Sequence, residues 1–192
     1  MTADLQLHVP EDPKGVWYIL SKASKTLRCE HMPLKDFAAK LGEVFDRRCE
    51  CAPDYAAAPV AVDPPPRANA LMQLIASARL TYLRQPDGTL VLMPALGEPV
   101  RPAQPIQLHK SAEGQFSVDG VEVDAVSLLE LLMGMNGASW TTPDTLRPTP
   151  VKAPTNGHKP FDEVIALLCQ AAGWKWSRME DGKYLIQVTG SR

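Results

Sequence analysis

The fold is decided by two stretches of sequence that align without a gap, residues 66–94, PRANALMQLIASARLTYLRQPDGTLVLMP, and residues 160–188, PFDEVIALLCQAAGWKWSRMEDGKYLIQV. Each position of the first stretch matches the position 94 residues later in the second, so that Leu74 meets Leu168 and Tyr82 meets Trp176. In both stretches, apolar residues at helical spacing come before two short apolar segments separated by Asp-Gly. This order predicts a helix followed by a β-hairpin, and Gly173 lies where the helix of the second stretch is expected to end. An internal repeat of this kind predicts two copies of one structural unit.

The matching extends upstream of the two stretches, with small changes in length. Apolar residues at helical spacing predict one helix over residues 34–46 and another over residues 124–135, the second with Asp124 as its N-cap. Alternating patterns predict two strands over 17–34 and two over 106–123, and a short strand is predicted just before each Pro-Asp pair, at 51–54 and at 141–144. Each copy is therefore expected to have the order strand-strand-helix-strand-helix-strand-strand, an α+β sandwich.

Proline-rich segments separate these elements. Residues 95–105, ALGEPVRPAQP, are predicted to form a semi-rigid linker between a first domain over residues 14–94 and a second over residues 106–190. The proline-rich segments 56–66 and 148–160 are predicted to be loops inside the two copies. The chain is thus expected to consist of two small domains in tandem.

Composition indicates a globular protein and disfavours two classes of partner. The chain has 192 residues, a formal net charge of −2 and 45% hydrophobic residues. A nucleic-acid-binding domain usually carries a basic patch or stripe, so we expect no nucleic-acid partner. No stretch approaches the roughly 18 consecutive apolar residues of a membrane span. The first residues, MTADLQLHVPEDPKG, lack the basic start and apolar core of a signal peptide, so we expect either a cytoplasmic protein or the mature part of a longer precursor.

The spacing of the four cysteines differs from that of zinc sites. Cys169 lies on the apolar face of a predicted helix and is expected to be buried. Cys29 and the pair Cys49 and Cys51 fall on strands that are predicted to be neighbours. In an oxidising compartment, the pattern therefore allows one disulfide between Cys29 and either member of the pair.

The sequence lacks the common catalytic and phosphate-binding motifs. It contains no G-x-S-x-G, no G-x-x-x-x-G-K-[ST], no H-E-x-x-H and no G-x-G-x-x-G after a strand. The four histidines are scattered and do not correspond between the two copies. The prediction is a protein that is not an enzyme and that has neither a metal site nor a cofactor.

The first copy carries a resemblance to a known family in its second helix and the hairpin that follows. The residues that carry it are Ala70, Leu71, Leu74, Ile75, Leu80, Tyr82, Asp87, Gly88, Thr89, Leu90, Val91 and Leu92. Together with the element order, this pattern resembles the secretin and TonB short N-terminal domain. The second copy departs from the pattern, with Trp174 and Trp176 in place of leucine and tyrosine.

The resemblance implies a non-enzymatic module of a bacterial cell-envelope machine, such as a secretin, pilus or TonB-linked system. It implies a periplasmic location and an envelope protein as partner, bound for example by β-strand addition. We expect the contact residues to be exposed residues of the final hairpins and edge strands, where both copies have an aromatic residue and an arginine: Tyr82, Arg84, Trp174, Trp176 and Arg178. Two alternatives stay open. The aromatic residues of the second copy could belong to its core, and the chain could be a cytoplasmic phage- or plasmid-borne accessory or regulatory protein, with or without nucleic-acid binding. The sequence also leaves the oligomeric state open.

Overall fold

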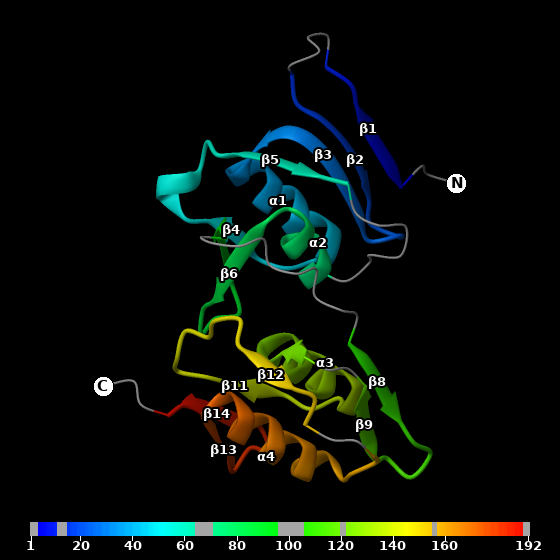
Figure 1. Ribbon diagram of the computed structural model, residues 1–192, viewed down its shortest axis with the longest axis vertical. Helices are drawn as coiled ribbons and strands as arrows, with labels where there is room; N and C mark the ends of the chain where they lie inside the picture. The colour runs from blue at the N-terminus through cyan, green and yellow to red at the C-terminus, as the bar shows by residue number, and fades with distance from the viewer. Residues whose placement is uncertain are drawn as a thin grey trace. The chain divides into compact units, whose positions relative to one another are not determined.

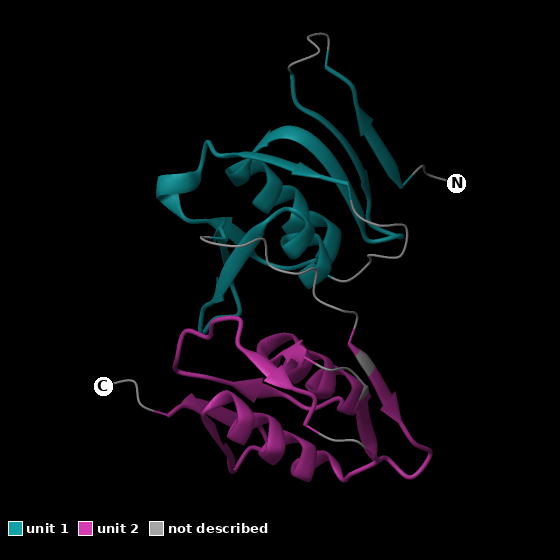
Figure 2. Cartoon of the chain, viewed as in Figure 1, with its two compact units in different colours: residues 1–103 teal, residues 104–192 magenta. Residues whose placement is uncertain are grey.

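The computed structural model describes residues 4–10, 15–63, 71–95, 106–119, 122–154 and 157–189. The chain divides into two compact units, unit 1 over residues 1–103 and unit 2 over residues 104–192 (Figure 2). The division falls within the predicted linker 95–105, of which all but Ala95 lies outside the described residues. Both units combine helices with small sheets, so the predicted α+β class is confirmed.

Unit 1 contains two helices, a short 3-10 helix and seven strands among its described residues (Figure 1). In chain order the elements are β1 (Leu5–His8), β2 (Trp17–Ser21), β3 (Thr26–Pro33), α1 (Leu34–Phe45), β4 (Cys49–Cys51), η1 (Pro53–Tyr55), β5 (Pro59–Val62), α2 (Leu71–Ser77), β6 (Leu80–Arg84) and β7 (Leu90–Pro94). One antiparallel sheet has the order β1-β2-β3-β5. A second sheet has the order β4-β7-β6, in which β4 is parallel and β6 antiparallel to β7.

Helix α1 connects the two sheets of unit 1. It contacts β2, β3 and β5 of the first sheet and β4 and β7 of the second. Its apolar residues recur every three or four positions, as expected for a helix with one buried face. That face consists of Leu34, Phe37, Ala38, Leu41 and Val44, all of which are buried. The helix predicted over residues 34–46 is therefore confirmed, and it forms the centre of the core of unit 1.

Unit 2 contains two helices and seven strands among its described residues. In chain order they are β8 (Gln107–Lys110), β9 (Phe116–Asp119), β10 (Glu122–Asp124), α3 (Ala125–Asn136), β11 (Trp140–Thr141), β12 (Pro150–Lys152), α4 (Phe161–Ala172), β13 (Trp174–Arg178) and β14 (Tyr184–Val188). Strand β8 pairs with β9, and β10 pairs with β12. The remaining sheet has the order β11-β14-β13, with β11 parallel and β13 antiparallel to β14.

In unit 2, the start of α3 and the end of α4 lie at capping residues that the sequence indicates. Asp124 precedes α3, and its carboxylate accepts a hydrogen bond from the Ser127 N–H at 3.0 Å. Gly173 ends α4 with a φ of 70°, a left-handed conformation that glycine adopts without steric cost. Helix α4 contacts α3, β12 and β13, so its apolar side lies in the core of unit 2.

Several strands occur where the sequence predicts none. Strands β5 and β12 begin at Pro59 and Pro150, inside the segments 56–66 and 148–160 that were expected to be loops. They pair with the strand that leads into the first helix of their unit, Pro59 with Pro33 and Pro150 with Asp124. Proline is tolerated at the first residue of an edge strand, because on the outer side of such a strand no neighbour needs its missing N–H. The predicted order is therefore wrong by one strand in each unit. In addition, β1 precedes the predicted start of the first domain, and unit 2 has three strands rather than two before α3.

Candidate partner-binding site

The final hairpins of the two units have the same strand register. Each residue pair of β13 and β14 is the corresponding pair of β6 and β7 shifted by 94 positions. The end pairs are Leu80–Pro94 and Arg84–Leu90 in unit 1, and Trp174–Val188 and Arg178–Tyr184 in unit 2. Both turns are closed by an aspartate, since Asp87 accepts a hydrogen bond from the Thr89 N–H at 2.9 Å and Asp181 accepts one from the Lys183 N–H at 3.1 Å. The Asp-Gly turns that were predicted from the sequence thus set the register of both hairpins.

Tyr82 and Arg84, the two predicted contact residues of unit 1, are buried. Only 4% and 8% of their surfaces are exposed. Both lie on the same side of β6 as Leu80, because side chains alternate along a strand, and β6 packs against α2. The Arg84 guanidinium donates a hydrogen bond to the Gln85 carbonyl oxygen at 3.3 Å. The expectation that these residues are exposed is therefore wrong.

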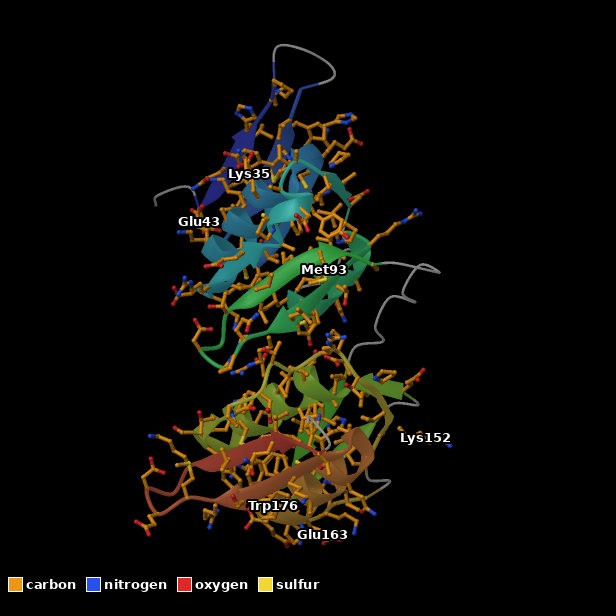
Figure 3. All side chains as sticks on the ribbon, turned by 90° about the vertical axis from the view of Figure 1, so that its left-hand side faces the viewer. Lys35, Glu43, Met93, Lys152, Glu163 and Trp176 are labelled. Atoms are coloured by element: carbon orange, nitrogen blue, oxygen red, sulfur yellow. The ribbon has the colours of Figure 1, made fainter. Side chains whose placement is uncertain are left out.

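The three predicted contact residues of unit 2 differ in exposure along β13. Trp174 is 7% exposed and belongs to the core, as the alternative reading of the sequence allowed. Trp176 is half-buried, and Arg178 is exposed. The exposed end of this hairpin, with Trp176 and Arg178, is therefore the part of the predicted site that a partner can reach (Figure 3 labels Trp176).

Trp176 and three other side chains form a polar and aromatic cluster. The Trp176 ring stacks on the Tyr184 ring, with centroids 5.8 Å apart. The Arg178 guanidinium lies over the same ring, 5.0 Å from its centroid, and donates a hydrogen bond to the Tyr184 hydroxyl oxygen at 2.5 Å. The Tyr184 O–H in turn donates to the carboxylate of Asp162, in the first turn of α4. The cluster joins the start of α4 to the hairpin, and Asp162 was not among the contact residues predicted from the sequence.

The Tyr184 hydroxyl is expected to contribute to the stability of unit 2. Burial and the hydrogen bond to Asp162 raise the pKa of Tyr184, so the phenol remains the protonated donor. We expect Tyr184→Phe to lower the free energy of unfolding by about 1–2 kcal/mol at neutral pH, because Asp162 loses its donor. Urea denaturation followed by tryptophan fluorescence measures this change. Ser177→Ala, which removes an exposed hydroxyl from β13 of the same unit, is the control and should change it by less than about 0.5 kcal/mol.

The same contact predicts a pH dependence. The pKa of Tyr184 is higher in the folded than in the unfolded protein, so its contribution is complete below the unfolded value and is lost as the pH rises above about 10. The difference in stability between the wild-type protein and Tyr184→Phe should therefore shrink in alkaline buffer. A constant difference from neutral pH to about pH 11 would contradict the assigned role of the hydroxyl.

All four cysteines are free thiols in the structure. Cys29 lies in β3 of the first sheet of unit 1, whereas Cys49 and Cys51 lie in β4 of the second sheet. The neighbours of β3 are β2 and β5, and β5 is the strand that the sequence did not predict. The expectation that Cys29 and the Cys49–Cys51 pair occupy neighbouring strands is therefore wrong. Cys169 is buried, as predicted.

The buried thiols are expected to resist alkylation. Burial raises the pKa of Cys29 to about 11 and that of Cys169 to about 12. Because the thiolate is the reactive form, we expect iodoacetamide at about pH 8 to leave both unmodified in the folded protein and to modify both in guanidinium. Mass spectrometry of the peptides measures each cysteine separately, with half-buried Cys51 as the accessible comparison. Labelling of Cys29 as fast as Cys51 in the folded protein would show that the described core of unit 1 is wrong.

Strand β1 is a second candidate surface, which is not among those predicted from the sequence. Leu5 and Leu7 are 59% and 63% exposed, and Val9, just after the strand, is 72% exposed. The strand lies at the edge of the first sheet (Figure 1). The signal that could have found it is the alternation of these apolar residues with Gln6 and His8.

The described residues contain no group of three or more His, Cys, Asp and Glu side chains that could hold a metal ion. Within the same part of the chain, no helix is long and apolar enough to cross a membrane. No family model, no curated protein and no solved structure matches the chain.

Proposed function

We propose that the chain is a non-enzymatic protein–protein interaction module of a bacterial cell-envelope machine, built from two tandem units similar to the secretin and TonB short N-terminal domain. The strand pairing that the two units share carries this proposal. In each unit, the strand after the first helix (β4 or β11) is parallel to the last strand (β7 or β14), and the hairpin partner (β6 or β13) is antiparallel on its other side. In each unit, the strand before the second helix also pairs with the strand that leads into the first. A repeated sequence together with a repeated pairing supports duplication of one unit.

The partner is proposed to bind at β13 by strand addition. Strand β13 is an edge of its sheet, so that among the described residues no strand pairs with its outer side. The side chains of Lys175 and Ser177 are exposed on one face of β13. Those of Trp176 and Arg178 alternate with them and lie on the other face. In strand addition, main-chain hydrogen bonds supply affinity and the flanking side chains supply specificity. Tryptophan and arginine are enriched among residues that dominate binding energy. Trp176 is half-buried and Arg178 is exposed, whereas Tyr82 and Arg84 on the equivalent edge β6 of unit 1 are buried, which supports β13 as the binding edge.

Site-specific photo-crosslinking in the native host tests the proposal. A photoreactive amino acid replaces Lys175 or Ser177 on β13, and Ala171, exposed on α4 of the same unit, is the matched control position. We expect the full chain in the periplasmic fraction, crosslinked from both β13 positions but not from position 171 to a protein of a secretion or uptake machine. A cytoplasmic chain, or equal crosslinking from all three positions, would overturn the proposal.

A further inference from the structure

Strand β1 presents an unprotected apolar edge. Natural proteins usually protect such edges with lysine, proline or a bulge, because unpaired main-chain groups invite another strand. Residues 5–8, LQLH, contain none of these, and all four residues of β1 are exposed. Leu5 and Leu7 lie on one face of the strand, opposite Ser21 and Ile19 of β2. Two large apolar side chains therefore stand on the open edge of the sheet.

The structure holds β1 in an extended conformation at both ends. At one end, the Asp4 carboxylate accepts hydrogen bonds from the Ser21 hydroxyl and from the N–H groups of Lys22 and Ala23, at 3.1 and 2.9 Å for the two N–H groups. At the other end, the His8 ring stacks on the Tyr18 ring, with centroids 5.3 Å apart. A strand that is ordered before binding loses less conformational entropy when it pairs with a partner.

The residues of β1 are complementary to themselves in the antiparallel direction. If Gln6 lies opposite Gln6 of another copy, Leu5 lies opposite Leu7 and Asp4 opposite His8. This register places apolar residues opposite apolar residues on one face, and an acidic residue opposite an imidazole on the other. It places no like charges opposite each other. We propose that β1 is a homodimerisation edge, which pairs antiparallel with β1 of a second copy of this chain around Gln6.

Two features favour a second copy over a strand of another protein. The match of Asp4 with His8 and of Leu5 with Leu7 needs no residue from outside this chain, as a two-fold interface requires. Pairing of the two edges also joins two four-stranded sheets and leaves no β1 edge exposed, so the assembly closes as a dimer. The interface involves a different edge from β13, so it does not depend on the function proposed above.

Oxidative crosslinking of single-cysteine additions tests the register in the full chain. Gln6 lies on the two-fold axis, so we expect Gln6→Cys to form a disulfide-linked dimer readily on oxidation. Leu5→Cys alone should crosslink poorly, whereas a mixture of the Leu5→Cys and Leu7→Cys proteins should give the mixed dimer, since directly opposite residues are closest. The wild-type protein, with its four thiols, gives the background. Strong crosslinking of Leu7→Cys with itself, and weak crosslinking of Gln6→Cys, would overturn the assigned register.

Sedimentation equilibrium tests the dimer itself. At roughly 1–300 μM, we expect the wild-type mass to rise from 21.0 kDa toward twice that value. The double variant Leu5→Lys/Leu7→Lys should raise the dissociation constant at least about tenfold, because four leucines lose their apolar contacts in each dimer. Leu131→Lys/Met135→Lys is the matched control, since these residues are 44% and 43% exposed on α3 of unit 2 and the change of charge is the same. A wild-type protein that is monomeric throughout, or equal weakening by both double variants, would overturn the proposal and leave the β1 edge to a strand of another protein.

Discussion

Leu168→Ala is expected to lower the free energy of unfolding of unit 2 by about 2–5 kcal/mol. Leu168 lies in α4 with none of its surface exposed, so its removal leaves a cavity in addition to the lost apolar contact. Three of the four tryptophans, Trp140, Trp174 and Trp176, lie in unit 2. Urea denaturation followed by tryptophan fluorescence therefore reports mainly on this unit.

Two further variants make the expectation specific. Leu167→Ala removes the adjacent, half-buried leucine and should cost about 1 kcal/mol or less, because a partly exposed side chain leaves no closed cavity. Leu74→Ala removes the residue that aligns with Leu168, which is also fully buried, and should lower the stability of unit 1 by about 2–5 kcal/mol. Equal losses for Leu167→Ala and Leu168→Ala would contradict the described packing of α4.

Gly42→Ala is expected to destabilise unit 1 by about 1–3 kcal/mol. Gly42 lies in the last turns of α1, and its carbonyl oxygen accepts a hydrogen bond from the Arg47 N–H at 3.0 Å. A β-carbon at this position would lie 2.6 Å from the Arg47 carbonyl oxygen. That oxygen belongs to the backbone, so the clash can be relieved only by moving the segment between α1 and β4. Urea denaturation followed by circular dichroism measures the loss.

Gly134→Ala is the control, for which we expect a change in stability of the opposite sign. Gly134 lies in α3, where a β-carbon would have no atom within 4 Å. Alanine is the better helix former by about 0.5–1 kcal/mol, so this variant should be stabilised. Destabilisation by both variants would mean that the contact with Arg47 is not the reason for glycine at position 42.

The sequence predicted those elements whose signal is local. The helices α1, α3 and α4 follow from apolar spacing, and the caps at Asp124 and Gly173 follow from residue type. The turns of both hairpins follow from Asp-Gly. All these signals lie within a few residues of the element that they specify, which is why they can be read without tertiary contacts.

Local sequence signals did not predict which of the binding residues are exposed. Arg84 and Arg178 align at a shift of 94 positions and occupy the same hairpin register, yet Arg84 is buried and Arg178 is exposed. A partner-binding role for Trp176 and Arg178 stays a prediction. Asp162 joins Arg178 and Tyr184 although it lies sixteen residues before Arg178, and no spacing rule connects a helix start with a later hairpin.

By itself, the sequence determined the α+β class, the positions of the helices and the register of both hairpins, because these depend on side-chain periodicity and turn chemistry. Only the tertiary structure decided that the proline-flanked β5 and β12 are strands, since a strand at a sheet edge forms by pairing with residues far away in the chain. It also placed Cys29 and Cys49 in separate sheets and left the apolar side chains of β1 exposed. Burial and strand neighbours depend on which distant segments meet, and that information is not contained in any single stretch of the sequence.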